Sequence, residues 1–155
     1  MRTPRLSLCL AAASLLSLTG LALPQIASAE PQAAESVDGL LATADVTAGA
    51  KTGKACQTCH SVDKGGATRI GPNLWNIVNR PVGSVAGFHY STAFKKVTAK
   101  TWSYHELNEW LYAPSAEAPG TTMSFAGVKK TQDRANVIAW LRTLSDSPAP
   151  LPKAK

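Results

Sequence analysis

The pentapeptide Cys56-Gln57-Thr58-Cys59-His60 constrains the fold more than any other part of this chain. Two thiols three residues apart lie on one side of a helical turn, and a histidine follows directly. This C-x-x-C-H spacing is the attachment sequence of c-type haem, in which each thiol forms a thioether to one vinyl group and the imidazole lies under the iron. A chain with this sequence has to fold around a large, flat, apolar group.

Two other chemistries use closely spaced cysteines. A C-x-x-C pair can be a redox dithiol, but that reading needs a βαβ context, and no segment here alternates for long with the period of two that strands require. Two thiolates and a histidine can also hold zinc, but the sequence offers no convincing fourth ligand. The sequence therefore predicts one haem c, attached covalently through Cys56 and Cys59.

The first 29 residues have the order of a cleaved secretory signal peptide. Residues 1–5 are positive, the 18 residues 6–23 carry no charge, and Ala27-Ser28-Ala29 supplies small residues for a cleavage site. An uncleaved anchor is the alternative, because such a stretch approaches the roughly 20 residues that span a bilayer. Cleavage would place the protein in the periplasm. It removes two arginines and no acidic residue, which lowers the net charge from +6 to +4.

The rest of the chain divides into a domain with two flanking segments. Residues 30–44 are rich in Ala, Gln and Glu without strong periodicity, and we predict a flexible leader there. Residues 147–155 form a Pro-rich tail, because its prolines cannot lie inside a helix. The folded domain is expected over residues 45–146.

Three main helices are predicted in this domain, so the fold class is all-α. The last follows Thr131 as N-cap, with Val137, Trp140, Leu141 and Leu144 on one face. The middle helix follows the capping box Ser103-Tyr104-His105-Glu106, with Trp102 and Leu107 as a hydrophobic staple, and stops before Pro114. The first, weaker helix spans residues 46–56.

Long Gly- and Pro-rich loops, at residues 65–87 and 114–127, lie between these helices. Loops of this length are uncommon in compact domains unless they bind something. Three short helices also bury little apolar surface. A large apolar cofactor resolves both problems, because the loops can pack on it.

The iron needs a second axial ligand, and Met123 is the best candidate. It is the only methionine that remains after signal cleavage, and it lies in the Gly-Pro turn Pro119-Gly120-Thr121-Thr122-Met123, a poor place for a core-filling side chain. His89 and His105 are the alternatives. His105 falls at the start of a capped helix, where exposure is expected, whereas His89 lies in a Gly-Phe-His-Tyr loop.

These motifs resemble class I cytochromes c of the mitochondrial and alphaproteobacterial type, and the resemblance covers roughly residues 45–144. Beyond the pentapeptide, it is carried by Gly71-Pro72-Asn73-Leu74, by Arg80 with Gly83 and Gly87-Phe88-His89-Tyr90-Ser91, by residues 119–127 around Met123, and by the helical run at residues 136–141. The resemblance implies a small cytochrome c fold, with short helical turns and long loops wrapped round one haem.

It also implies roles for individual residues. The Pro72 carbonyl would accept a hydrogen bond from the ring N–H of His60 and strengthen it as a ligand. Three side chains would donate to the haem propionates, and three would line the haem near the methionine. The propionate donors are Arg80, Tyr90 and Trp102, and the others are Trp110, Thr121 and Phe125.

The chain departs from the family pattern at three places. The first helix lacks the aromatic residue that usually packs on the last helix, so we expect Gly49 or Gly53 to receive Trp140. Trp110 stands where a tyrosine is common, which removes a hydroxyl near the Met123 sulfur. Phe94 replaces a polar residue near the propionates, which would dry that side.

With both axial positions filled by His60 and Met123, no site remains open for a substrate. We therefore expect a one-electron carrier that cycles between Fe(III) and Fe(II) and links respiratory or photosynthetic complexes, not an enzyme. Two alternatives stay open. One is a membrane-anchored or complex-bound cytochrome c subunit, and the other is a haem enzyme or gas sensor with a displaceable methionine.

The excess of positive charge suggests the kind of partner. A basic ring would steer the protein toward acidic docking faces of a bc-type complex, a terminal oxidase, a reaction centre or a dehydrogenase. Nucleic-acid binding is not expected, because the basic residues are not interleaved with exposed aromatics. We expect a monomer, with no membrane span once the signal is cleaved. The lysines that flank the predicted pocket are Lys54, Lys64, Lys95, Lys96, Lys100, Lys129 and Lys130.

Overall fold

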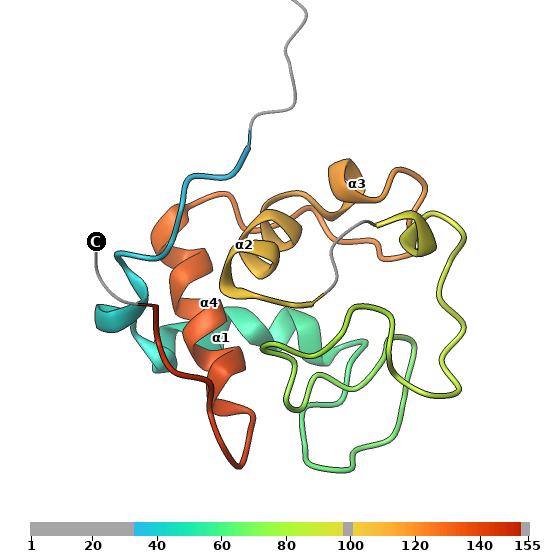
Figure 1. The fold of residues 1–155 in the computed structure, drawn as a ribbon, viewed down its shortest axis with the longest axis horizontal. Helices are drawn as coiled ribbons and strands as arrows, with labels where there is room; N and C mark the ends of the chain where they lie inside the picture. The colour runs from blue at the N-terminus through green and yellow to red at the C-terminus, as the bar shows by residue number, and fades with distance from the viewer. Residues whose placement is uncertain (1–32, 98–100, 153–155) are drawn as a thin grey trace, which may run out of the picture. The chain divides into compact units, whose positions relative to one another are not determined.

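Helices and irregular loops make up the described part of the chain, residues 33–97 and 101–152 of a computed structural model (Figure 1). The predicted signal peptide, residues 1–29, lies outside these ranges. The all-α fold class is confirmed, and the described residues contain no strand beyond an isolated bridge between Pro81 and Thr101. The elements in chain order are η1 (Leu41–Thr43), α1 (Val46–Gln57), η2 (Phe94–Lys96), α2 (Tyr104–Tyr112), α3 (Pro114–Glu117) and α4 (Thr131–Thr143).

Helices α1 and α4 pack directly against each other at two glycines. The Asp45 carboxylate caps α1 by accepting hydrogen bonds from the backbone of Thr47 and Ala48. A Cβ atom at Gly53 would overlap the Trp140 ring, and one at Gly49 would overlap the backbone carbonyl of Asn136. The expected packing of Trp140 on a glycine of α1 is confirmed, because the Trp140 ring occupies the space that the missing side chain of Gly53 leaves.

Helix α2 begins as its capping signal predicts. The Ser103 hydroxyl accepts a hydrogen bond from the Glu106 N–H at 3.1 Å. Trp102 and Leu107, the predicted staple, are both buried. Pro114 follows the end of α2 and opens α3, where a proline is tolerated because the first turn has no use for its missing N–H. The buried face of α2 carries Leu107, Asn108, Trp110 and Leu111.

The predicted N-cap of α4 is wrong by one residue. Lys130 occupies the cap position, and no side chain caps this helix. Thr131 is the first helical residue, and its hydroxyl donates to the Glu35 carboxylate at 2.7 Å. The Thr131 hydroxyl, which the local sequence predicted to cap the helix, therefore bonds to a residue 96 positions earlier in the chain.

The predicted flexible leader is also wrong for the residues that the structure describes. Residues 33–44, here called the N-terminal strap, pack on the helices, and the side chains of Val37 and Leu41 are almost fully buried. The Leu41 N–H donates to the Val37 carbonyl, which places both side chains on one turn. One turn is too short to produce a periodic pattern, so this packing could not be predicted from hydrophobic periodicity.

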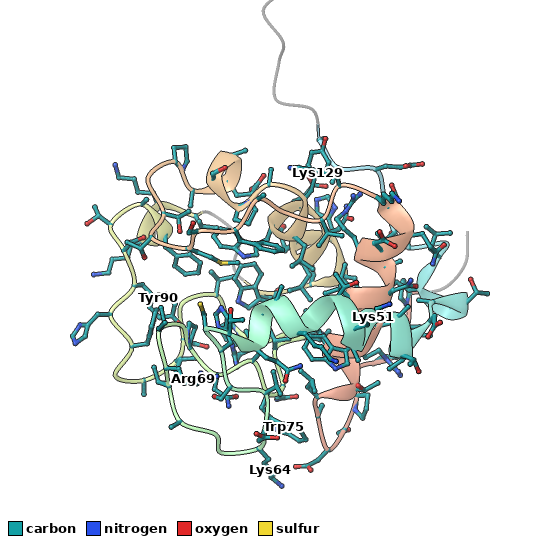
Figure 2. The ribbon with its side chains drawn as sticks, turned by 180° about the vertical axis from the view of Figure 1, so that it is seen from behind. Lys51, Lys64, Arg69, Trp75, Tyr90 and Lys129 are labelled. Atoms are coloured by element: carbon teal, nitrogen blue, oxygen red, sulfur yellow. The ribbon has the colours of Figure 1, made fainter. Side chains whose placement is uncertain are left out.

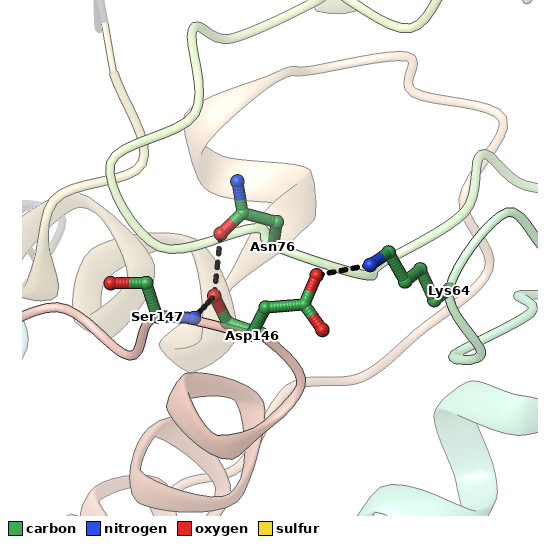
Figure 3. A network of polar contacts seen from close by, with 5 residues as sticks. Lys64, Asn76, Asp146 and Ser147 are labelled. Carbon is green, nitrogen blue, oxygen red and sulfur yellow. Dashed lines mark hydrogen bonds and ion pairs between the residues drawn. The ribbon is translucent and has the colours of Figure 1, made fainter.

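The C-terminal tail is extended but attached. The Ala149 carbonyl accepts hydrogen bonds from the Tyr104 hydroxyl at 3.2 Å and from Arg142 Nε at 2.6 Å. Leu151 packs against the core. Just before the tail, Ser145 donates to the Asn76 side chain at 2.8 Å and Asp146 pairs with Lys64 (Figure 3). These contacts hold the end of α4 against the loop that follows the haem-attachment motif.

Candidate haem-binding site

A cavity of about 480 Å³ lies among α1, α2, α4 and the two long loops. Most of its wall is apolar, as a site for a flat aromatic cofactor requires. Its polar and sulfur-containing groups come from the end of α1, from the loop between α1 and η2, and from the loop after α3. The apolar lining includes Leu74, Ile77, Phe94, Leu107, Leu111 and Leu141.

The haem-attachment pentapeptide ends α1 and turns into this cavity. Backbone N–H groups of Cys59 and His60 both donate to the Cys56 carbonyl, which forms a tight turn at the helix end. Arg69 reinforces the turn by donating from Nη1 to the Gln57 carbonyl at 2.7 Å. Both cysteines are free and half-buried, and Cys56, Cys59 and His60 all line the cavity. The turn thus presents both thiols and the imidazole to one space.

The His60 ring is held in one orientation. Its Nδ1 lies 2.6 Å from the Pro72 carbonyl oxygen, which is the contact that the resemblance implied. A neutral imidazole that donates from Nδ1 carries its lone pair on Nε2, the nitrogen a metal would use. Gly71 packs on the ring so closely that a Cβ atom there would overlap it.

Burial lowers the pKa of His60, and the nearby positive charge of Arg80 acts in the same direction, against the opposing effect of the Pro72 contact. The imidazole is therefore neutral at neutral pH and able to act as a ligand. Burial also raises the pKa of the Cys56 thiol. A reactive dithiol needs a lowered thiol pKa, so this environment disfavours the redox-dithiol alternative.

Asn73 shapes the loop that positions Pro72. Its side-chain amide donates to the Ser61 hydroxyl at 2.8 Å and to the carbonyls of Asp63 and Gly66 at 3.0 and 3.1 Å. Its carbonyl oxygen accepts from the Trp75 N–H at 2.7 Å. The sequence identified Asn73 only as part of a motif, and the structure shows that it ties the loop to the segment after His60.

The predicted axial-methionine loop also lines the cavity. Thr121, Met123 and Phe125 are half-buried, whereas Thr122 and Ser124 between them are exposed. The Thr121 hydroxyl accepts a hydrogen bond from the Met123 N–H at 3.3 Å, and the Phe125 N–H donates to the Met123 carbonyl at 3.1 Å. All five residues line the cavity, and Thr121, Met123 and Phe125 are the more buried ones.

The two alternative histidine ligands are placed differently. His89 and His105 are both exposed, and neither lines the cavity. Of the three side chains considered for the second axial position, the structure brings only Met123 to the cavity that holds His60.

Aromatic rings form the inner wall between the two loops. Trp102 and Trp110 are buried and meet edge to face at 5.5 Å between ring centroids. Phe94 meets Trp110 at 5.4 Å and stacks on Tyr90 at 4.8 Å. Phe94 therefore joins Tyr90 to the apolar wall that the two tryptophans form.

Arg80 supplies an uncompensated positive charge at this cavity. The half-buried guanidinium donates from Nη1 to the Trp75 carbonyl at 2.9 Å. No acidic side chain of the described residues forms an ion pair with it. The Tyr90 hydroxyl nearby accepts from the Val85 N–H at 3.2 Å, and its proton remains available (labelled in Figure 2). A cationic group and a free hydroxyl at the edge of an apolar cavity fit a haem carboxylate.

Ile77 was missed by sequence reasoning, although it is buried and lines the cavity. It lies between Asn76 and Asn79, whose φ angles are +55° and +62°. Asparagine tolerates this conformation better than most residues, so the Asn-x-x-Asn spacing was the available signal for a turn that aims the isoleucine inward.

The zinc alternative finds no support in the geometry. Within residues 33–97 and 101–152, no group of three or more His, Cys, Asp and Glu side chains could hold a metal ion. The cavity instead combines two thiols, an oriented imidazole, a thioether, apolar walls and a free cation. This set fits covalent haem.

Comparisons with known proteins also point to covalent haem. The family model for cytochrome c matches residues 46–145. A cytochrome c homolog of Bradyrhizobium diazoefficiens is 44% identical over 79% of this chain and 66% of its own length. A cytochrome c-type cyt cy of Rhodobacter capsulatus is 44% identical over 74% of this chain and 56% of its own length. Cytochrome c2 of Afifella marina is 40% identical over 70% of this chain and 90% of its own length.

The fold and site define a small all-α protein built round one covalent haem. The chain belongs to the cytochrome c family. Membership makes covalently bound haem c its cofactor. The chain spans less than two thirds of the length of the Bradyrhizobium and Rhodobacter relatives. Among the described residues, no helix has both the length and the apolar character needed to cross a membrane.

Proposed function

We propose that this protein is a periplasmic one-electron carrier in which His60 and Met123 hold the haem iron. One observation carries the proposal: His60 and Met123, from separate segments, line the same apolar cavity, and Pro72 fixes the imidazole. Export rests on the signal-like order of residues 1–29. When bound, haem supplies a one-electron Fe(III)/Fe(II) couple.

The chain's own residues attach, orient and insulate that group. Cys56 and Cys59 would form the two thioethers, and His60 would present Nε2. Arg80, Tyr90 and Trp102 would receive the propionates, because each offers a donor at the cavity. The lining residues Trp110, Thr121 and Phe125 would exclude water around the Met123 sulfur. Where water is excluded, the surroundings of the iron rearrange little when it changes between Fe(III) and Fe(II). This favours rapid electron transfer over chemistry at the iron.

The predicted docking lysines are not equivalent in the structure. Lys64 pairs with Asp146 at 2.5 Å, although both side chains are more than half exposed and the pair is weak. Lys129 donates to the Tyr112 carbonyl and lies over its ring at 4.5 Å from the centroid. Figure 2 shows these two lysines far apart.

Four other lysines of the predicted ring, Lys54, Lys95, Lys96 and Lys130, are in the described ranges, whereas Lys100 lies outside them. Lys95 and Lys96 end η2, next to the Phe94 wall. We propose that these lysines steer the protein to acidic faces of redox partners, with an association rate that falls as salt rises.

Carbon monoxide binding to the reduced protein tests the carrier proposal. We expect the wild type to bind carbon monoxide negligibly at neutral pH, because the Met123 sulfur fills the position that the gas requires. Met123→Ala is expected to bind it rapidly and completely, and His89→Ala is the matched control that should behave as wild type. Rapid, complete binding by the wild type would instead make the protein a haem enzyme or gas sensor.

A further inference from the structure

The N-terminal strap is attached to α2 and α4 through polar contacts as well as apolar ones. The Glu35 carbonyl accepts hydrogen bonds from Asn108 Nδ2 at 3.1 Å and from Arg134 Nη2 at 3.0 Å. The Ala34 N–H donates to the Glu109 carboxylate at 3.0 Å. The burial of Val37 adds an apolar anchor. The strap precedes the residues that the cytochrome c family model matches.

Arg134 is the junction between the strap and the methionine loop. Its side chain is 1% exposed, so every N–H that loses its acceptor would be left unsatisfied in the interior. Nε donates to the Asn108 side chain at 2.9 Å, and Nη2 donates to Glu35. Nη1 donates to the carbonyls of Val128 and Lys129 at 3.1 and 2.7 Å. One guanidinium thus connects the strap, α2 and the residues that follow Met123.

Those residues are fixed on α2 at the same point. The Val128 N–H donates to the Leu111 carbonyl at 2.7 Å. Gly127 has a φ of +89°, and a Cβ atom there would overlap the Tyr112 carbonyl. The loop that carries Met123 therefore has a fixed end four residues beyond the methionine, and Arg134 accounts for two of the hydrogen bonds there.

We propose that the N-terminal strap is a positioning element for the Met123 loop and that it acts through Arg134. When the strap is attached, all the acceptors of Arg134 are in place and the far end of the loop is fixed. When the strap detaches, Nη2 loses its acceptor, and the buried cation is free to reorient away from Val128 and Lys129. The consequence for iron ligation rests on the proposed function of Met123.

The experiment uses the haem-loaded full chain with Val37→Asp, which places a charge under the strap. Leu151→Asp is the matched control, because Leu151 anchors the C-terminal tail on the same core and has no part in the Arg134 contacts. Amide hydrogen exchange at Val128 is compared with exchange at Ala139 in the core of α4. Imidazole binding to the ferric protein reports how readily Met123 is displaced.

We expect Val37→Asp to speed Val128 exchange relative to Ala139 about tenfold and to tighten imidazole binding by about the same factor. Leu151→Asp should change neither ratio. Val37→Ala, a milder change, should give the same pattern with smaller amplitude if Val37→Asp does not fold. Equal slowing or speeding of Val128 and Ala139 in the Val37 variants would overturn the proposal.

A double variant tests the route through Arg134. Arg134→Lys keeps the positive charge but cannot reach all of the acceptors. We expect Val37→Asp added to Arg134→Lys to speed Val128 exchange no further than Arg134→Lys alone, whereas additive effects would exclude this route. If Met123 is not the ligand, imidazole binding will be tight in the wild type already. Val128 exchange still decides whether the strap holds the loop.

Discussion

Replacing both Cys56 and Cys59 by alanine is expected to give a chain that no longer unfolds cooperatively. The two thiols are the covalent attachment, and without them the protein must either collapse or keep a cavity of about 480 Å³. At about 24 cal/mol per Å³, an empty cavity of that size costs ~10 kcal/mol. That cost is as large as the whole stability of an ordinary domain, roughly 5–15 kcal/mol.

The measurement is a thermal melt followed by circular dichroism, on protein made with the haem-attachment machinery present. We expect a broad, shallow loss of helix for the double variant and a sharp transition for the wild type. Thr58→Ala is the matched control, because it alters the exposed residue between the cysteines and leaves both thiols. A sharp, wild-type-like transition without bound haem would show that the helices form their own core, contrary to our account.

Gly49→Ala is expected to destabilise the protein more than any other addition of a single methyl group to its helices. At Gly49 the new Cβ would overlap the Asn136 backbone carbonyl and approach the Trp140 Cβ at 3.0 Å. Backbone atoms cannot rotate away as a side chain can, so α1 and α4 would have to separate. We expect a loss of ~3 kcal/mol in the free energy of unfolding and a fall in melting temperature of roughly 10 °C.

Gly39→Ala provides the control for this substitution, because a Cβ at Gly39 meets no atom within 4 Å. It makes the same chemical change in the N-terminal strap, and we expect the free energy of unfolding to move by no more than about 0.5 kcal/mol. Denaturant titration of the two haem-loaded variants measures the free energy of unfolding of each. Equal stability of the two variants would mean that α1 and α4 do not pack as closely as described.

The parts of the fold that the sequence predicted correctly are those in which local chemistry decides. Ser103 caps α2 because its hydroxyl and the Glu106 N–H lie within one turn of chain. The contact between a glycine of α1 and Trp140 was predicted from the family resemblance, because the family pattern places an aromatic side chain between the first and last helices. The cap could be predicted without knowledge of distant parts of the chain, whereas the contact between α1 and α4 needed the family pattern.

The parts that were missed depend on distant partners. Residues 33–44 lack a periodic pattern, yet they are ordered by Arg134, which lies about a hundred residues later. Thr131 has the residue type of an N-cap, but its hydroxyl finds Glu35 instead. Both errors have one cause: Glu35 of the strap accepts hydrogen bonds from α4, and the local sequence of α4 does not indicate that such a distant acceptor is present.

The candidate site shows the same division. The contact between His60 and Pro72 was expected from the motif and is present at 2.6 Å. The engagement of Lys129 by Tyr112 could not be foreseen, because it depends on how the methionine loop returns to α2. Counting lysines near a motif predicted a basic surface but did not show which ammonium groups are held by contacts within the protein.

The most direct test of our account is the near-red absorption spectrum of the oxidised, haem-loaded protein. A weak band of methionine-to-ferric charge transfer is expected in the wild type at neutral pH and in His89→Ala. It is expected to be absent in Met123→Ala with the helical circular dichroism unchanged. The same variant should have a reduction potential lower by on the order of 0.2 V, because a thioether ligand stabilises Fe(II). Persistence of the band in Met123→Ala would contradict the assignment of Met123 as the second axial ligand.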